Sequence, residues 1–466
     1  QKGQQWAVLG GNGSGKSALA DVLCNTLKPQ RGERHWQHDL DPKNDIQQLS
    51  FERHRQLIEH DKRFDNSNEN DDAFDTGTTV RRFITENTSA RQRQPTADLN
   101  AIAKQCGISS ILDQGIRYIS TGESRKMLLA RALFDQPKIL VIDNPYEGLD
   151  YHSQASFRAL LEQLLLSDIA ILLLLQDPSE LPANISHIMQ LAGGRIMVQG
   201  PKEQQLKQLQ PLRTTTNYIN PTLPEALSRP YTIPLDQPLI KLSHVNVSYH
   251  EKPILIDISW RFEHGQHCHI SGPNGAGKST LLSLLCGDNH KAYGQDIYLF
   301  GRKRGSGETI WEIKEKFGVV NTQLQLTHIN RMRVAEVVAS GLFDTVGLYK
   351  NCQGKAREIA LQWLHTTGLA PLAKTPFGEL SFGEQRLALL ARAMVKSPLI
   401  LILDEPCLGL DRNHRQQMLA LIDQIAKSGR SHILYVSHVN EELPSCINQK
   451  LQLVTHLDGG FTGDVC

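Results

Sequence analysis

The chain has 466 residues, 40% of them hydrophobic, which is enough for two or three domains with sizeable cores. Its 50 Lys and Arg residues balance 49 Asp and Glu residues, which gives no support to broad binding of nucleic acid or of an acidic membrane surface, although a local patch is compatible with it. The 8 cysteines form no C-x-x-C pair and no cluster with metal-ligand spacing, so we expect reduced core thiols of a cytosolic protein.

The first predicted feature is a strand that turns into a helix through residues 10–17, GGNGSGKS. This G-x-x-x-x-G-K-S pattern lets backbone N–H groups point at phosphate oxygens, and the helix N-terminus adds positive potential. We expect Lys16 to reach the β- and γ-phosphates of a nucleotide and Ser17 to bind Mg²⁺. Because only nine residues precede this loop, an earlier strand and turn are expected to be missing. The other expected phosphate-loop residues are Gly10, Asn12, Gly13 and Gly15.

Further along, residues 60–75 are rich in Asn and Asp and predict a surface loop or a partly disordered insertion. The apolar runs at residues 139–143 and 169–175 predict buried strands of a parallel sheet. The first run ends in Asp143, which we expect to supply a carboxylate to the Mg²⁺ shell. No apolar run approaches the roughly 20 residues that a membrane-spanning helix needs, and no signal peptide is recognisable.

A second copy of the same motifs follows in the same order, 261 or 262 residues later. Residues 272–279 read GPNGAGKS, and residues 380–384 (LSFGE) repeat residues 119–123 (ISTGE). A strand at residues 399–404 again ends in aspartate, Asp404. The fourth repeated motif is Gly-Leu-Asp, at residues 148–150 and 409–411. Four short motifs that keep order and spacing over such an offset indicate a duplicated domain.

The connection between the two copies differs in composition. It is rich in proline, which prevents a continuous helix and suits an extended connector. We therefore expect domain 1 at residues 1–202, a linker at 203–236 and domain 2 at 237–466. The prolines are Pro201, Pro211, Pro221, Pro224, Pro230, Pro234 and Pro238.

The two copies resemble the ATP-binding cassette (ABC) ATPases, whose L-S-G-G-Q signature precedes the metal-binding aspartate by about two dozen residues. Ser120 and Ser381 each precede their aspartate by 23 residues, and each signature keeps its second glycine, Gly122 or Gly383. The resemblance is strongest to the ModF-type tandem ATPases, which are molybdenum transport ATP-binding proteins. It implies two P-loop domains of α/β class, each with a RecA-like parallel-sheet core, an antiparallel β subdomain (truncated in the first) and a helical signature subdomain.

Head-to-tail pairing of the two domains is implied as well, so that each ATP lies between the phosphate loop of one domain and the signature of the other. One site then joins Ser120 and Gly122 to the second phosphate loop. Glu405 matches the family's catalytic base, His438 its switch histidine, and Tyr249 the aromatic residue that stacks on adenine. Ser279 and Asp404 would hold Mg²⁺. The phosphate-loop residues of this site are Gly272, Asn274, Gly275, Gly277, Lys278, Ser279 and Thr280.

The other site joins Lys16, Ser17 and Asp143 to Ser381 and Gly383. Its residues at the positions of Glu405 and His438 are the amides Asn144 and Gln176. An amide cannot accept the proton of the attacking water, and general-base assistance contributes about 10²–10⁴-fold to such a step. We therefore expect this site to bind ATP but to hydrolyse it slowly.

Three functional readings follow. The first and favoured one is the ATP-binding subunit of a transporter, on the cytoplasmic side of the inner membrane, with a separate permease as partner. The others are a regulatory switch, and an ATPase acting on the ribosome or on nucleic acid. The family's glutamine loop is matched only weakly, by Glu52 in the first half and Gln323 in the second, which weakens the transporter reading. The proline-rich linker with few basic residues argues against a ribosome-acting protein.

Overall fold

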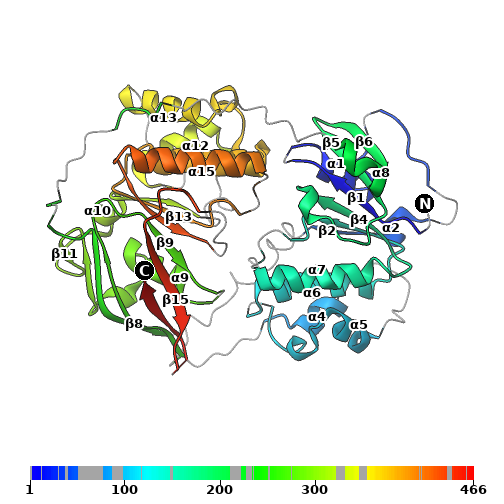
Figure 1. Ribbon diagram of the computed structural model, residues 1–466, viewed down its shortest axis with the longest axis horizontal. Helices are drawn as coiled ribbons and strands as arrows, with labels where there is room; N and C mark the ends of the chain where they lie inside the picture. The colour runs from blue at the N-terminus through cyan, green and yellow to red at the C-terminus, as the bar shows by residue number, and fades with distance from the viewer. Residues whose placement is uncertain are drawn as a thin grey trace. The chain divides into compact units, whose positions relative to one another are not determined.

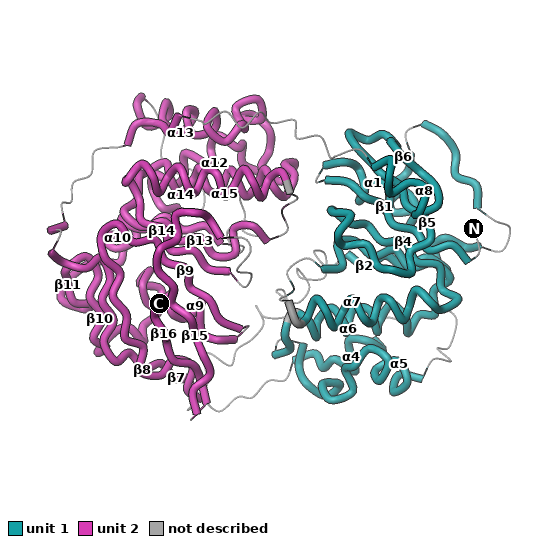
Figure 2. The backbone as a smooth tube through the Cα atoms, viewed as in Figure 1, with its two compact units in different colours: residues 1–215 teal, residues 216–466 magenta. Residues whose placement is uncertain are grey.

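The chain forms two α/β units, residues 1–215 and 216–466, each described here by itself (Figure 2). This computed structural model describes residues 3–11, 13–29, 31–36, 40–50, 77–86, 98–116, 118–146, 149, 151–209, 222–226, 233–234, 236–249, 252–273, 275–321, 331–345, 354–408, 410, 412–437, 443–457 and 459–466. The polar stretch at 60–75 and both glutamine-loop candidates, Glu52 and Gln323, lie outside the described residues.

Unit 1 is built on a six-stranded sheet with the order β2-β3-β4-β1-β5-β6, and Figure 1 labels all of these strands except β3. The first five strands are parallel to their neighbours, and β6 is antiparallel to β5. The strands are β1 (Trp6–Leu9), β2 (Ile46–Ser50), β3 (Ile139–Asp143), β4 (Ala170–Leu175), β5 (His187–Ala192) and β6 (Arg195–Pro201).

The helices of unit 1 cover this sheet and form a helical layer beside it. Helices α4 and α5 pack against α6, the helix that follows the signature residues. The helices are α1 (Lys16–Leu23), α2 (Pro42–Asp45), α4 (Val80–Thr85), α5 (Leu99–Cys106), α6 (Thr121–Phe134), α7 (Tyr151–Leu164) and α8 (Lys202–Gln205).

Unit 2 repeats this sheet and extends it. Its strands run in the order β11-β10-β7-β8-β16-β15-β9-β14-β13-β12, and the last six match the whole sheet of unit 1. The other four form the antiparallel lobe expected of the family. The strands are β7 (Ile240–Tyr249), β8 (Lys252–Phe262), β9 (Cys268–Ser271), β10 (Asp296–Leu299), β11 (Arg302–Lys303), β12 (Phe317–Val320), β13 (Ile400–Asp404), β14 (His432–Val436), β15 (Gln449–Thr455) and β16 (Phe461–Val465).

The helices of unit 2 follow the same plan, with α12 and α13 packed against the signature helix α14. They are α9 (Lys278–Cys286), α10 (Ile310–Lys314), α12 (Val334–Ser340), α13 (Lys355–Thr366), α14 (Phe382–Met394) and α15 (Arg412–Lys427). In the part of the chain that the structure describes, no helix is long and apolar enough to cross a membrane.

The apolar runs predicted as central strands are confirmed as β4 and β13. Leu173, Leu174 and Leu175 of β4 are fully buried, as are residues 400–403 of β13. Continuous apolar sequence is typical of such strands because helices cover both faces of a parallel sheet. The parallel arrangement matters for the site, since it brings the carboxyl ends of neighbouring strands to one edge of the sheet.

Part of the segment predicted as a linker packs on unit 2. Leu223 lies against the core of the helical layer, and the carbonyl of Thr222 accepts a hydrogen bond of 3.1 Å from Thr366 Oγ1. The carbonyl of Pro224 accepts a hydrogen bond from Arg430. In this stretch the extended chain is therefore fixed by backbone carbonyl contacts to unit 2.

Candidate nucleotide-binding sites

Both phosphate loops follow a strand in the middle of their sheet, β1 or β9, and lead directly into a helix. Helix α1 begins at Lys16 after Gly15, whose φ is 101°, and α9 begins at Lys278 after Gly277, whose φ is 86°. Only glycine adopts this left-handed conformation at little cost. Neither helix start is capped by a side chain, so its first N–H groups can serve an anion.

The phosphate-loop lysines fold back over their own loops. The Lys278 ammonium donates to the carbonyls of Gly272 and Pro273 at 2.7 and 3.0 Å. Lys16 donates in the same way to the carbonyls of Gly10 and Gly11. The two lysines are only 6% and 8% exposed, whereas the next residues, Ser17 and Ser279, are exposed. In each loop the lysine ammonium is therefore held by the loop carbonyls, next to an exposed serine.

The predicted metal ligands of unit 1 are brought together. Ser17 Oγ donates to Asp143 Oδ2 at 3.0 Å, which joins the start of α1 to the end of β3. The neighbouring Asn144 Oδ1 is buried and has no hydrogen-bond partner among the described residues. Mg²⁺ binds oxygen ligands such as a hydroxyl and a carboxylate, and the amide oxygen can accept a hydrogen bond from one of its water ligands. The residues present thus fit a bound Mg²⁺.

The residues after the two metal-site aspartates adopt the same turn. Asn144 has φ 47° and Glu405 has φ 49°, both left-handed. The Asn144 N–H donates to Leu174 O at 3.0 Å, and the Glu405 N–H donates to Val436 O at 2.9 Å. The Glu405 and Asn144 side chains therefore leave the backbone at equivalent positions, directly after the carboxyl end of β13 or β3.

The signature residues begin helices α6 and α14 with identical caps. Ser120 accepts from the N–H of Glu123, while Glu123 accepts from the Ser120 N–H at 2.8 Å and from its hydroxyl at 2.7 Å. Ser381 and Glu384 repeat this arrangement. The glutamates stand at the fifth signature position, where the family pattern has glutamine. The sequence interpretation did not foresee that they orient the serine hydroxyls.

The signature glycines are required by packing. A Cβ at Gly383 would lie 2.4 Å from the ring of His414, and one at Gly122 would lie 2.8 Å from Ser153 Oγ. Both glycines are buried. The signature helix therefore lies close against α15 in unit 2, and the equivalent approach in unit 1 is to α7.

Tyr249, the predicted adenine-stacking residue, ends β7 and is 38% exposed. Two residues earlier, Val247 pairs with Leu255, and the Leu255 side chain would lie 2.7 Å from a Cβ on Gly277. The tyrosine hydroxyl accepts a hydrogen bond of 2.8 Å from Asn289. The strand pair β7–β8 thus holds Tyr249 next to the segment that packs on the phosphate loop, with part of its ring open.

Three predicted site residues, Asn12, Asn274 and His438, lie outside the described residues. Gln176, which is aligned with His438, follows β4 directly. Its N–H donates to Glu180 Oε2 at 2.9 Å. The last described residue before His438 is Ser437, whose hydroxyl lies 3.2 Å from Nε2 of the buried His269.

Two buried residues near these sites were missed by the sequence interpretation. Burial lowers the pKa of His269 to about 4, so its ring is neutral at pH 7. Arg125 on α6 is 7% exposed and reaches the turn at Asn144. The repeat offers a signal for Arg125, because Arg386 stands 261 residues later; nothing in the repeat marks His269, since its counterpart is Ala7.

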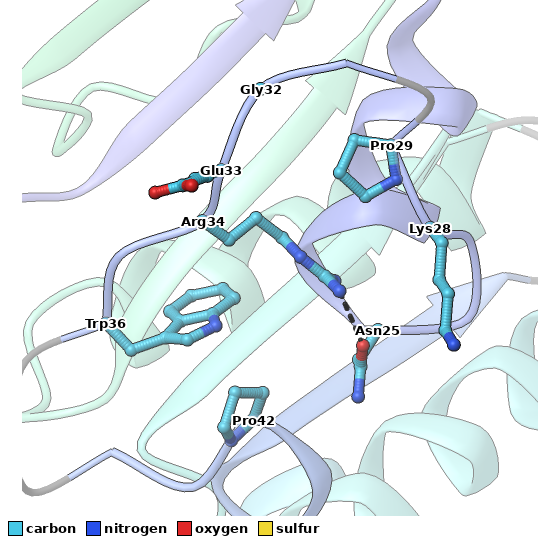
Figure 3. Close-up of a pocket in the computed structure, with 8 residues that line it drawn as sticks. All are labelled: Asn25, Lys28, Pro29, Gly32, Glu33, Arg34, Trp36 and Pro42. Carbon is cyan, nitrogen blue, oxygen red and sulfur yellow. Dashed lines mark hydrogen bonds between the residues drawn. The ribbon is translucent and has the colours of Figure 1, made fainter.

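A surface pocket of about 570 Å³ lies elsewhere on unit 1, between the end of α1 and α2 (Figure 3). Arg34 crosses it and donates to Asn25 Oδ1 at 2.8 Å, with Trp36 beside it. The pocket contains none of the predicted site residues. In unit 2 the corresponding segment carries β10 and β11.

Comparisons with known proteins agree with this geometry. The family model "ABC transporter" matches the chain twice, over residues 1–147 and 255–408. The ABC transporter ATP-binding protein ModF of Escherichia coli is 39% identical over 98% of this chain and 92% of its own length. An uncharacterized ABC transporter ATP-binding protein of Schizosaccharomyces pombe is 27% identical over 98% of this chain and 93% of its own length.

Solved structures show the same tandem fold. An archaeal ribosome recycling factor, aABCE1, crystallised with the ribosomal stalk protein aP1, covers 99% of this chain and is itself covered to 85%, with a TM-score of 0.54 at 17% identity. At that identity the likeness concerns the fold alone. The duplicated family match and the identity to ModF decide the family: the chain belongs to the ABC transporter family as a tandem ATP-binding protein, and it is an ATP hydrolase.

Proposed function

We propose that the chain binds two Mg-ATP molecules in head-to-tail sites and hydrolyses ATP mainly at the site that contains Glu405. Each site would use the phosphate loop of one unit and the signature of the other. The Glu405 site would take Ser120 and Gly122 from unit 1. The Asn144 site would take Ser381 and Gly383 from unit 2 and would chiefly bind.

The observation that carries this proposal is the pair of matching turns. Asn144 and Glu405 have φ values of 47° and 49° and make the same backbone hydrogen bond to the adjacent strand. The difference between the sites therefore lies in the side chain rather than in the backbone. A carboxylate accepts a proton from water, and an amide does not.

The roles of the other residues follow from what they touch. Lys278 would leave the loop carbonyls for the phosphates of ATP, because phosphate oxygens are stronger, charged acceptors. Ser279 and Asp404 would hold Mg²⁺, as Ser17 and Asp143 would in the other site. The ion would neutralise charge on the phosphates when bound. Glu405 would orient the attacking water and take its proton, and Tyr249 would stack on adenine with the open part of its ring.

Glu405→Gln, matched with Asn144→Gln, tests the proposal. Losing a general base costs about 10²–10⁴-fold, so kcat for ATP should fall by that factor in Glu405→Gln and by less than about threefold in Asn144→Gln. Both variants should still bind two nucleotides, as measured by equilibrium dialysis. Unchanged hydrolysis in Glu405→Gln would refute the assignment of the hydrolytic site.

For the biological role we propose the ATP-binding subunit of a transport system that resembles ModF, with a membrane permease as its partner. The identity to ModF over nearly the whole chain supports this. The Glu405→Gln protein should remain ATP-loaded and closed, so it is the form to use for capture from detergent-solubilised membranes. Recovery of a multi-span membrane protein, lost when Lys278→Ala prevents ATP binding at the Glu405 site, is the expected result.

A non-transport ATPase is the alternative role. The tandem fold shared with an archaeal ribosome recycling factor is the observation in its favour. ATP-dependent co-sedimentation of the Glu405→Gln protein with ribosomes, without any membrane partner, would favour this alternative over transport.

A further inference from the structure

The signature helix of unit 1 is tied to the turn at Asn144 by one buried side chain. Arg125 lies on α6, five residues after Ser120, and is 7% exposed. Its Nη1 donates to the carbonyl of Asn144 at 3.0 Å and to that of Pro145 at 3.0 Å. One guanidinium therefore joins the helix that carries the signature to the turn that follows β3.

This contact fixes the orientation of the Asn144 peptide units. The Asn144 N–H donates to Leu174 on β4, while its carbonyl accepts from Arg125. A buried cation is costly unless it is hydrogen-bonded, and charge-assisted hydrogen bonds are about twice as strong as neutral ones. A shift of the turn would therefore break contacts that Arg125 cannot replace with water, and α6 would have to follow the turn.

The second unit has an arginine at the equivalent position, 261 residues later. Arg386 lies on α14, five residues after Ser381, and is fully buried. Its guanidinium carbon lies 5.4 Å from the centre of the Phe382 ring. A buried arginine at this position in both halves is not needed to cap the helix, because Glu123 and Glu384 already do so.

We propose that Arg125 is a positioning residue that couples the two ATP sites through unit 1. The inference rests on the proposed head-to-tail pairing, in which the Asn144 turn faces the ATP of its own unit while Ser120 faces the ATP of the Glu405 site. ATP bound beside Asn144 then acts through Arg125 on the position of Ser120. Occupancy of the binding site thereby sets the rate at the hydrolytic site.

A double-mutant cycle tests this coupling. Lys16→Ala empties the Asn144 site, and Arg125→Ala removes the link. Coupling energies between sites correspond to about 5–150-fold effects, so each single variant should lower kcat about tenfold. Because both changes interrupt one path, the double variant should also be lowered about tenfold. An additive loss of about a hundredfold would overturn the proposal.

The control variant is Lys126→Ala. Lys126 is the next residue on α6, but its ammonium donates to Ser156 on α7 instead of to the turn. It should change kcat less than about twofold, and the same-sized loss as in Arg125→Ala would refute a specific role for Arg125. Arg125→Lys, which keeps the charge and one donor nitrogen, should recover at least about threefold over Arg125→Ala.

If occupancy of the Asn144 site sets the rate at the Glu405 site, the rate should depend sigmoidally on ATP concentration, and this gives a readout that a purely structural role would not change. The Hill coefficient should fall to about 1 in Arg125→Ala and stay at the wild-type value in Lys126→Ala. If Arg125→Ala lowers the unfolding temperature while kcat and the Hill coefficient stay as in wild type, the residue is structural and the proposal fails. Failure of the proposed function itself is recognised separately, by unchanged hydrolysis in Glu405→Gln.

Discussion

The turns after β3 and β13 have nearly the same backbone geometry at their first residue, which is Asn144 in one and Glu405 in the other. Both place a non-glycine residue in the left-handed region, at Asn144 and Glu405. Asparagine tolerates this region better than most residues, whereas glutamate is held there at a cost of about 1–2 kcal/mol. Unit 2 thus keeps a strained carboxylate at the position where we propose that it activates water, and unit 1 keeps the same backbone geometry with a side chain that tolerates it better. The comparison shows that the same backbone geometry is present with either side chain, so the geometry alone does not determine whether a carboxylate is available.

The sheets show a second difference between the units. Unit 2 continues past its six core strands into the antiparallel lobe that holds Tyr249, while the described sheet of unit 1 ends at six strands. In the described residues of the segment between α1 and β2, the structure has the short helix α2 and the pocket crossed by Arg34 (Figure 3). The six core strands therefore have the same order in both units, with or without the antiparallel lobe in the described sheet.

The largest effect is expected from transferring the proposed catalytic glutamate and histidine of unit 2 to the equivalent positions of unit 1. In a Glu405→Gln background, Asn144→Glu together with Gln176→His should raise kcat about a hundredfold, since the backbone already presents residue 144 correctly and general-base assistance is worth about 10²–10⁴-fold. The measurement is steady-state ATP hydrolysis of the triple variant against Glu405→Gln alone. A triple variant no faster than that single variant would mean that the turns differ in more than a side chain.

A smaller effect is expected from replacing the signature glycines, because different side chains lie opposite them in the two units. Gly383→Ala forces a Cβ to 2.4 Å from the His414 ring, and overpacking of this kind costs about 1–3 kcal/mol. Gly122→Ala meets the smaller Ser153 side chain, with Oγ at 2.8 Å and Cβ at 3.1 Å, and should cost less. Calorimetric unfolding of the two variants measures the difference. His414→Ala should restore the Gly383→Ala protein, and equal losses in both glycine variants would contradict the packing explanation.

The smallest expected effect concerns pH and only unit 2. Burial lowers the pKa of His269 to about 4 from an ordinary value of 6.5, so the unfolded chain binds the proton more readily. The stability contributed by the neutral ring is complete above pH 6.5 and is lost as the pH falls towards 4. Between pH 8 and pH 5 the loss should be about 2 kcal/mol.

The matched variant for this test is His269→Ala, because unit 1 has Ala7 at the same position of its central strand. Its unfolding free energy, measured by urea titration at both pH values, should lack this part of the pH dependence. The same pH dependence in the wild type and the variant would show that His269 does not titrate as its burial implies.

Much of the backbone geometry around the candidate sites could be predicted from the sequence. The G-x-x-x-x-G-K-S loops need glycine at left-handed positions such as Gly15 and Gly277, so the pattern itself carries the backbone geometry. The apolar runs at 139–143 and 399–404 could be recognised as central strands because helices cover both faces of a parallel sheet. The repeat offset then aligned Asn144 with Glu405, and their turns have the same φ and the same hydrogen bond.

What the sequence determined by itself was therefore local: loops, strand ends and the residue types aligned by duplication, since glycine geometry and apolar periodicity act over a few residues. Only the tertiary structure decided that Arg125 reaches the Asn144 carbonyl, that His414 excludes a side chain at Gly383, and that His269 is buried beside Ser437. These contacts join residues 19, 31 and 168 positions apart. Their partners are fixed by how helices and strands pack, which no short pattern encodes.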